Sequence, residues 1–117
     1  MKKKVLCIAT LFLLCNCEAL FVENISEETI VLLAPTHNSE VLSGSIEFNW
    51  QEVSDATEYQ IQIAMPNFAN ASQIVLDSLA TSTIISKELE VGTYEWRIKA
   101  LNSEYATDYS VHSFSVK

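Results

Sequence analysis

Four carboxylates in two predicted loops have the chemistry to bind a cation. Glu52 and Asp55 lie in one loop, and Glu104 and Asp108 lie in another. If the fold brings both loops to one end of the domain, their oxygens supply part of the six to eight ligands that Ca²⁺ takes at about 2.3–2.6 Å. The alternative is a solvated acidic surface that keeps the domain soluble, and we favour it. We therefore predict no metal site.

Three aromatic side chains in predicted loops have the chemistry to bind sugars. Phe68, Tyr105 and Tyr109 are flat apolar rings on which a ligand ring can stack. The alternative places Tyr105 and Tyr109 over the edge of the domain and Phe68 in its own loop. Both interpretations stay open at the level of the sequence.

Catalytic chemistry is poorly supported. His37 and His112 have no cysteine partner nearby, whereas a zinc site needs three or four ligands in tetrahedral reach. Neither histidine accompanies a recognisable nucleophile. Gly44 and Gly92 are the only glycines, so no glycine-rich phosphate loop exists. We expect no enzyme activity and no cofactor.

The first residues differ sharply from the rest of the chain. Lys2, Lys3 and Lys4 precede an apolar run at 5–14, which is too short to cross a bilayer, since a spanning helix needs roughly 20 residues. A short apolar run behind a positive segment is typical of a secretory signal. Residues 14–17 (LCNC) resemble a bacterial lipobox, with Leu14 three residues before the modified Cys17. Modification at Cys15 is less suitable, because Leu14 would then occupy the position that prefers a small residue.

These features predict three segments: a lipoprotein signal peptide at 1–16, a lipidated cysteine and tether at 17–28, and a folded domain at 29–117. All three cysteines precede residue 18, so a disulfide inside the domain is impossible. Several acyl chains on Cys17 give near-permanent membrane attachment. We expect the protein in the cell envelope, in the outer membrane, facing the periplasm or the surface.

The charge balance excludes one class of partner. The whole chain has a net charge of −8, and loss of Lys2 to Lys4 leaves four basic against fifteen acidic residues, or −11. Such a protein has no basic patch to neutralise phosphates, so we expect no nucleic-acid partner. The surface charge does not favour anionic lipid either, so the membrane partner depends on the lipid anchor.

The sequence pattern of the domain predicts strands rather than helices. Apolar and polar residues alternate or cluster over seven short segments, at 29–33, 45–50, 59–63, 73–76, 81–86, 94–100 and 111–116. The segment at 94–100 alternates most clearly and directs Glu95, Arg97 and Lys99 outward. Two packed antiparallel sheets are the natural way to cover the apolar faces. The expected inward residues are Ile46, Phe48, Trp50, Tyr59, Ile61, Ile63, Tyr94, Trp96, Ile98 and Phe114.

Four segments together resemble the fibronectin type III family: Ala34-Pro35, 46–50, 56–63 and 89–102. The resemblance covers roughly 29–117 and implies an immunoglobulin-like sandwich of about seven strands, without implying an activity. Many members have one more residue between the glycine and the tyrosine than Gly92-Thr93-Tyr94, so we expect no tyrosine corner at Tyr94. With the lipobox, the chain resembles short lipoproteins of the Bacteroidota type. Asp77-Ser78-Leu79 resembles the O-glycosylation motif of that group, which implies a modified Ser78.

The sequence therefore predicts a non-catalytic, membrane-anchored lipoprotein whose domain is a protein interaction or adhesion module. The alternative function is a carbohydrate-binding accessory lipoprotein that assists glycan capture. An aromatic platform on one face of the domain favours the alternative.

Overall fold

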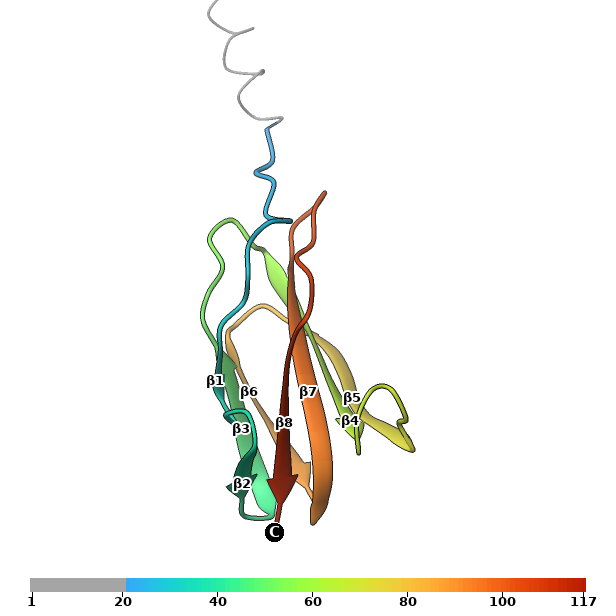
Figure 1. Cartoon of the computed structure of the whole chain (residues 1–117). Helices are drawn as coiled ribbons and strands as arrows, with labels where there is room; N and C mark the ends of the chain where they lie inside the picture. The colour runs from blue at the N-terminus through green and yellow to red at the C-terminus, as the bar shows by residue number, and fades with distance from the viewer. Residues whose placement is uncertain (1–20) are drawn as a thin grey trace, which may run out of the picture.

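Residues 21–117 are described by the computed structural model and form two facing β-sheets (Figure 1). Eight strands follow one another along the chain: β1 Leu32–Ala34, β2 Ser39–Val41, β3 Gly44–Trp50, β4 Glu58–Met65, β5 Gln73–Ala80, β6 Ile84–Leu89, β7 Gly92–Leu101 and β8 Ser110–Val116. Within this range there is no helix that is long and apolar enough to cross a membrane. The predicted signal peptide at 1–16 and the predicted lipidation of Cys17 lie outside the described residues.

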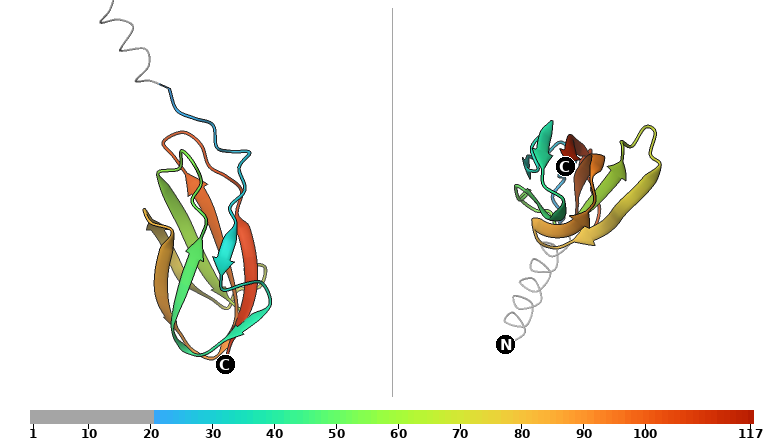
Figure 2. Two further views of the ribbon diagram at one scale, coloured as in Figure 1. Left: turned by 90° about the vertical axis from the view of Figure 1, so that its left-hand side faces the viewer. Right: turned by 90° about the horizontal axis from the view of Figure 1, so that it is seen from below.

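The strands form a sandwich of one small and one larger sheet. The small sheet has the order β1-β3-β6, and the larger sheet has the order β2-β8-β7-β4-β5. Figure 2 shows the sheets end on, with the β4–β5 hairpin projecting beyond the three-stranded sheet. The prediction of an all-β, two-sheet sandwich is confirmed. The prediction gave about seven strands, whereas the structure has eight. It also took all strand pairs to be antiparallel, whereas one pair is parallel.

The additional strand is β2, which pairs in parallel with β8. Pro35 lacks an N–H group and ends β1. Residues 35–38 then carry the chain across to the other sheet, where the N–H of Asn38 donates to the carbonyl of Ser113 at 2.7 Å. Asn38 adopts a φ of 64°, a conformation that asparagine tolerates better than most residues. β2 is only three residues long, so no alternation in the sequence reveals it.

The core lies between the sheets, and every inward residue named from the sequence is buried in it. Alternation places one face of each strand against the opposite sheet, as expected for strands with one solvated face. Phe48 packs edge-on against Trp96 and Phe114, with ring centroids 5.1 and 5.7 Å apart. Burial of such side chains contributes roughly 1.5–3 kcal/mol each, which stabilises a domain without disulfides.

The bounds of the predicted strands differ from the observed ones, most of all for β1, β5 and β6. β1 begins at Leu32 rather than at residue 29. β6 begins at Ile84 rather than at residue 81, because residues 81–83 form the connection from β5. The hydroxyl of Ser82 donates to the carbonyl of Ile84 at 3.0 Å within that connection. β5 continues to Ala80, four residues beyond the predicted end, because β4 offers pairing partners along that whole length.

Packing also extends into the segment expected to act as a tether. The side chain of Ile25 is only 2 % exposed and belongs to the core. The amide of Asn102 donates to the carbonyl of Glu23 at 2.9 Å, which ties the incoming chain to the sandwich. The chain enters at the end that carries the loops at 51–57 and 102–109 (Figure 1).

Candidate functional site

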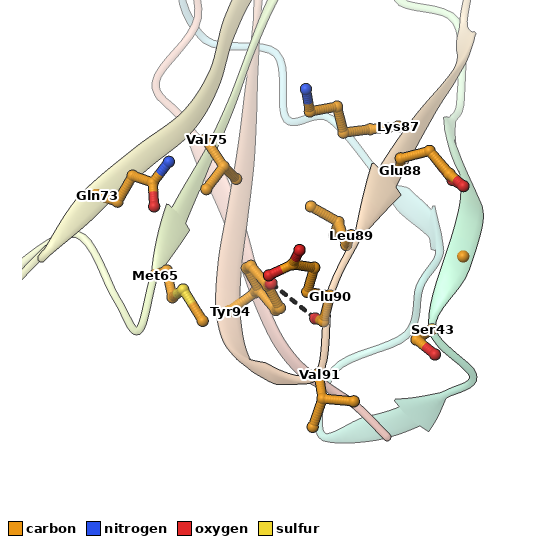
Figure 3. Close-up of a pocket in the computed structure, with 11 residues that line it drawn as sticks. Ser43, Met65, Gln73, Val75, Lys87, Glu88, Leu89, Glu90, Val91 and Tyr94 are labelled. Atoms are coloured by element: carbon orange, nitrogen blue, oxygen red, sulfur yellow. Dashed lines mark hydrogen bonds between the residues drawn. The ribbon is translucent and has the colours of Figure 1, made fainter.

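A groove of about 760 Å³ lies at the open side of the sandwich, between β5 and β6. These two strands are edges of different sheets and do not pair with each other. The groove is lined by Ser43, Gly44, Met65, Gln73, Val75, Lys87, Glu88, Leu89, Glu90, Val91 and Tyr94 (Figure 3). Leu89 and Tyr94 belong to the core, and Met65 and Val75 pack against it, whereas Glu88, Glu90 and Val91 are exposed.

Tyr94 forms one wall of the groove and corrects an expectation from the sequence. Its hydroxyl donates to the carbonyl of Glu90 at 2.8 Å, so the tyrosine corner does form (Figure 3). The β6–β7 turn is tight enough for the ring to reach back four residues despite the shorter spacing after Gly92. Burial raises the pKa of the Tyr94 phenol above its ordinary value of 10.0, and the nearby charge of Glu90 raises it further.

β5 is an edge strand beside this groove. Among residues 21–117 it pairs only with β4, and over eight residues its single charge is Asp77. Ile74 and Leu79 are 51 % and 59 % exposed. An edge strand with few charges and exposed apolar side chains offers free backbone groups to another strand. The groove reaches this edge, because Gln73 and Val75 of β5 are among its lining residues.

The predicted acidic tip lies at the end of the sandwich where the chain enters. Glu52, Asp55, Glu104 and Asp108 are all exposed there. Asn102 connects the two loops, since its amide donates to the carbonyl of Asp55 at 3.3 Å. Its side-chain oxygen accepts the N–H groups of residues 104 and 105. Among residues 21–117, no three acidic, histidine or cysteine side chains gather in a way that could hold a metal ion.

The structure separates the three candidate aromatic residues. Phe68 and Tyr109 both lie against the guanidinium of Arg97, with ring centroids 4.0 and 4.2 Å from its Cζ atom. Tyr105 instead packs against the core at the acidic tip. Arg97 was predicted to face outward, but its aromatic neighbours were not foreseen, because they come from loops 29 and 12 residues away.

Ser78 is exposed on β5, where its hydroxyl donates to the carbonyl of Leu79 at 3.3 Å. The neighbouring Asp77 accepts a hydrogen bond from the amide of Gln60 at 3.0 Å. That hydrogen bond, followed by one from Gln62, lowers the pKa of the Asp77 carboxyl below 3.8, with a smaller contribution from the charge of Arg97. Asp77 is therefore ionised and already partnered at neutral pH.

The two histidines meet at the β1–β2 connection, which the sequence did not indicate. Their ring centroids lie 5.5 Å apart. The N–H of Ser113 donates to Nδ1 of His37 at 3.1 Å, and Nδ1 of His112 lies 3.4 Å from the carbonyl oxygen of Pro35. These backbone contacts give both rings a role in holding the crossover against β8.

Comparison with known proteins defines the class of fold. The fibronectin(III)-like modules of Clostridium thermocellum CbhA superpose with a TM-score of 0.56 at 12 % identity, covering 76 % of this chain and 96 % of that one. The fn3 domain of human collagen alpha-1(XX) superposes with a TM-score of 0.57 at 13 % identity, covering 78 % of this chain and 88 % of that one. CopC from Methylosinus trichosporium OB3b superposes with a TM-score of 0.52 at 15 % identity, covering 76 % of this chain and 94 % of that one.

The chain therefore has a fibronectin type III-like fold, as its sequence pattern implied. No protein-family model matches the sequence, and no curated protein does so either. Identities this low concern the fold alone, and the activity of this chain is argued from its own surface.

Proposed function

We propose that this protein is a non-catalytic, membrane-anchored lipoprotein whose sandwich acts as a protein interaction module in the cell envelope. The lysine-led apolar segment and the LCNC sequence at 14–17 support the anchor. The fibronectin type III-like fold and the open groove support the interaction role.

The observation that carries this proposal is the groove beside the unpaired edge of β5. An extended segment of a partner protein adds to β5 as a further strand and places apolar side chains against Met65, Leu89 and Tyr94. Main-chain hydrogen bonds supply affinity in such strand addition, and pockets for alternate side chains supply specificity. Glu88 and Glu90 at the rim favour a segment that also carries a basic residue.

The groove is well placed for a tethered protein. Its lining includes Ser43, Gly44 and Val91, which lie at the opposite end of the sandwich from residue 21 (Figures 1 and 3). In the proposed lipoprotein, the groove therefore points away from the lipid anchor. A partner in the envelope reaches it without displacing the tether.

Glycan capture is a second candidate function, which one specific observation favours. Phe68 and Tyr109 converge on the outer face of the five-stranded sheet, around Arg97. Aromatic rings on one face were the feature expected to distinguish a carbohydrate-binding protein from a protein-binding one. Tyr105 does not take part in this arrangement.

The anchor is tested by intact-protein mass spectrometry of the membrane fraction. We expect a mass that corresponds to cleavage before Cys17 plus acyl chains, because the thiol of that residue is the predicted attachment point. In Cys17→Ala the acylated species should disappear, and Cys15→Ala serves as the matched control that should keep it. An unacylated native protein, or an acylated Cys17→Ala variant, would contradict the proposed anchor.

The interaction surface is tested by placing a photo-cross-linking residue at Leu79, on the β5 edge. We expect a discrete cross-linked protein in intact cells, because Leu79 is exposed beside the free edge. Val111 is the matched control, since it is also exposed but lies on β8, which pairs on both sides. Equal cross-linking from both positions, or none from Leu79, would refute binding at this edge.

A further inference from the structure

Arg97 is held in a defined orientation on the outer face of the five-stranded sheet. It lies near the middle of β7, and the rings of Phe68 and Tyr109 flank its guanidinium. Its Nε–H donates to the side-chain oxygen of Gln62 at 2.8 Å. Stacking uses the faces of the guanidinium and not its edge, so the Nη donors remain available in the plane.

A second cation lies beside this arrangement. The ammonium of Lys99 is 5.0 Å from the centroid of the Tyr109 ring, two residues along the same face of β7. Residues 21–117 contain only four basic side chains, and two of them, Arg97 and Lys99, lie here. A local concentration of positive charge on a strongly acidic protein attracts an anionic group.

Two acidic side chains lie near this pair, and each accepts hydrogen bonds from neutral groups. The Glu95 carboxylate accepts the N–H of Phe68 at 3.0 Å and the hydroxyl of Ser113 at 3.4 Å. Asp77 accepts the amide of Gln60. Over the described range 21–117, the one salt bridge joins Lys117 to Glu40, far from Arg97 in the sheet. Arg97 is thus ordered by Gln62 and two aromatic rings. Within residues 21–117 no carboxylate forms a salt bridge with it, although the charge of Asp77 is near enough to interact.

We propose that Arg97, Lys99, Phe68 and Tyr109 form a binding site for the carboxylate of an acidic sugar. This inference rests on the second candidate function, glycan capture, and names its ligand class. The planar guanidinium matches a carboxylate with two parallel hydrogen bonds. Because stacking fixes the guanidinium before the ligand arrives, little conformational entropy is lost on binding.

The position of the site favours a sugar over a peptide. β7 pairs with β4 on one side and β8 on the other, so its backbone cannot accept an added strand. A ligand on this face is therefore recognised through side chains alone. An uronic acid combines a ring that packs on an aromatic face with a carboxylate attached to that ring, which suits two aromatic residues around a cation.

The test is calorimetric titration of the full chain in non-ionic detergent with trigalacturonate and with the corresponding neutral galactose trimer. We expect trigalacturonate to bind at least about tenfold more tightly than the neutral trimer, since charge-assisted hydrogen bonds account for such a difference. Raising the salt concentration should weaken only the binding of the acidic sugar.

Variants assign the effect to the site. Arg97→Gln should lose about tenfold in affinity, and Lys117→Gln, which removes the same charge elsewhere, should change it by less than about twofold. Circular dichroism establishes whether each variant is folded. If Arg97→Gln is unfolded, the affinity of Lys99→Gln for trigalacturonate tests the site instead. Lys99 is exposed enough to be replaced, and loss of its charge should also weaken binding.

The outcomes separate this inference from the function on which it rests. Equal binding of the neutral and acidic trimers would refute the carboxylate site and leave glycan capture intact. Binding of neither trimer would count against both. Binding of triglutamate without binding of trigalacturonate would overturn the sugar assignment in favour of an acidic peptide.

Discussion

Trp96→Ala should lower the free energy of unfolding by about 3–5 kcal/mol, because it removes one of the largest fully buried side chains of the core. Trp96 is fully buried on β7 and packs against Phe48 at 5.1 Å and Trp50 at 6.5 Å between ring centroids. Its indole N–H donates to the carbonyl of Pro35 at 3.1 Å, which joins β7 to the crossover between the sheets. The substitution therefore leaves a cavity and removes the shorter of the two contacts to the Pro35 carbonyl, the other being Nδ1 of His112.

Urea unfolding followed by circular dichroism measures this loss. Small domains have a total stability of about 5–15 kcal/mol, so the variant should be marginal and its Tm lower by more than about 12 °C. Val111→Ala is the control, because Val111 lies on the outer face and is 44 % exposed. Its expected cost is within about 0.5 kcal/mol. A loss below about 1 kcal/mol for Trp96→Ala would mean that the core is not assembled around this residue.

The same residue shows why the core could be predicted from the sequence. Trp96 lies between Glu95 and Arg97, and a period of two residues is enough to direct it inward without knowledge of its partners. This local rule holds for strands long enough to alternate, including β3 and β8, which each have one three-residue neighbour. It fails for β2, whose three residues become a strand only because β8, about 75 residues further on, lies alongside.

The surface sites were harder to predict because they depend on contacts between distant segments. Phe68 was placed correctly in a loop, but nothing local indicates that the β4–β5 loop folds back onto Arg97. The groove depends on the two edges β5 and β6 lying in different sheets, which alternation does not determine. The shared position of the acidic loops at 51–57 and 102–109 was easier to predict, because they follow β3 and β7, which end on the same side of the sandwich.

Tyr94 illustrates the opposite error, in which spacing was given too much weight. Family spacing predicted no corner, yet the ring stacks on Phe114 with centroids 5.5 Å apart, and this packing holds the hydroxyl within reach of Glu90. Tertiary packing thus overrides a difference of one residue in a turn. The corner also contributes a wall of the groove, so its loss bears on stability and binding together.

Tyr94→Ala should destabilise the domain by about 3–5 kcal/mol, whereas Tyr94→Phe should cost only about 1 kcal/mol at pH 7. The first variant removes a ring that is 2 % exposed, and the second removes only the hydrogen bond to Glu90. Comparison of the two by urea unfolding separates packing from the corner itself. A Tyr94→Phe variant as unstable as Tyr94→Ala would refute this division.

The pH dependence gives this prediction an independent test. Because burial raises the pKa of Tyr94 above its ordinary value of 10.0, the folded state retains the phenolic proton at a pH where the unfolded state loses it. This stabilisation is fully present below pH 10 and is lost as the pH rises from there through the folded pKa. Tyr94→Phe lacks the proton, so its stability should fall less steeply over that range and approach that of the native protein. Parallel curves for the two proteins above pH 10 would show that the phenol of Tyr94 does not titrate in this way.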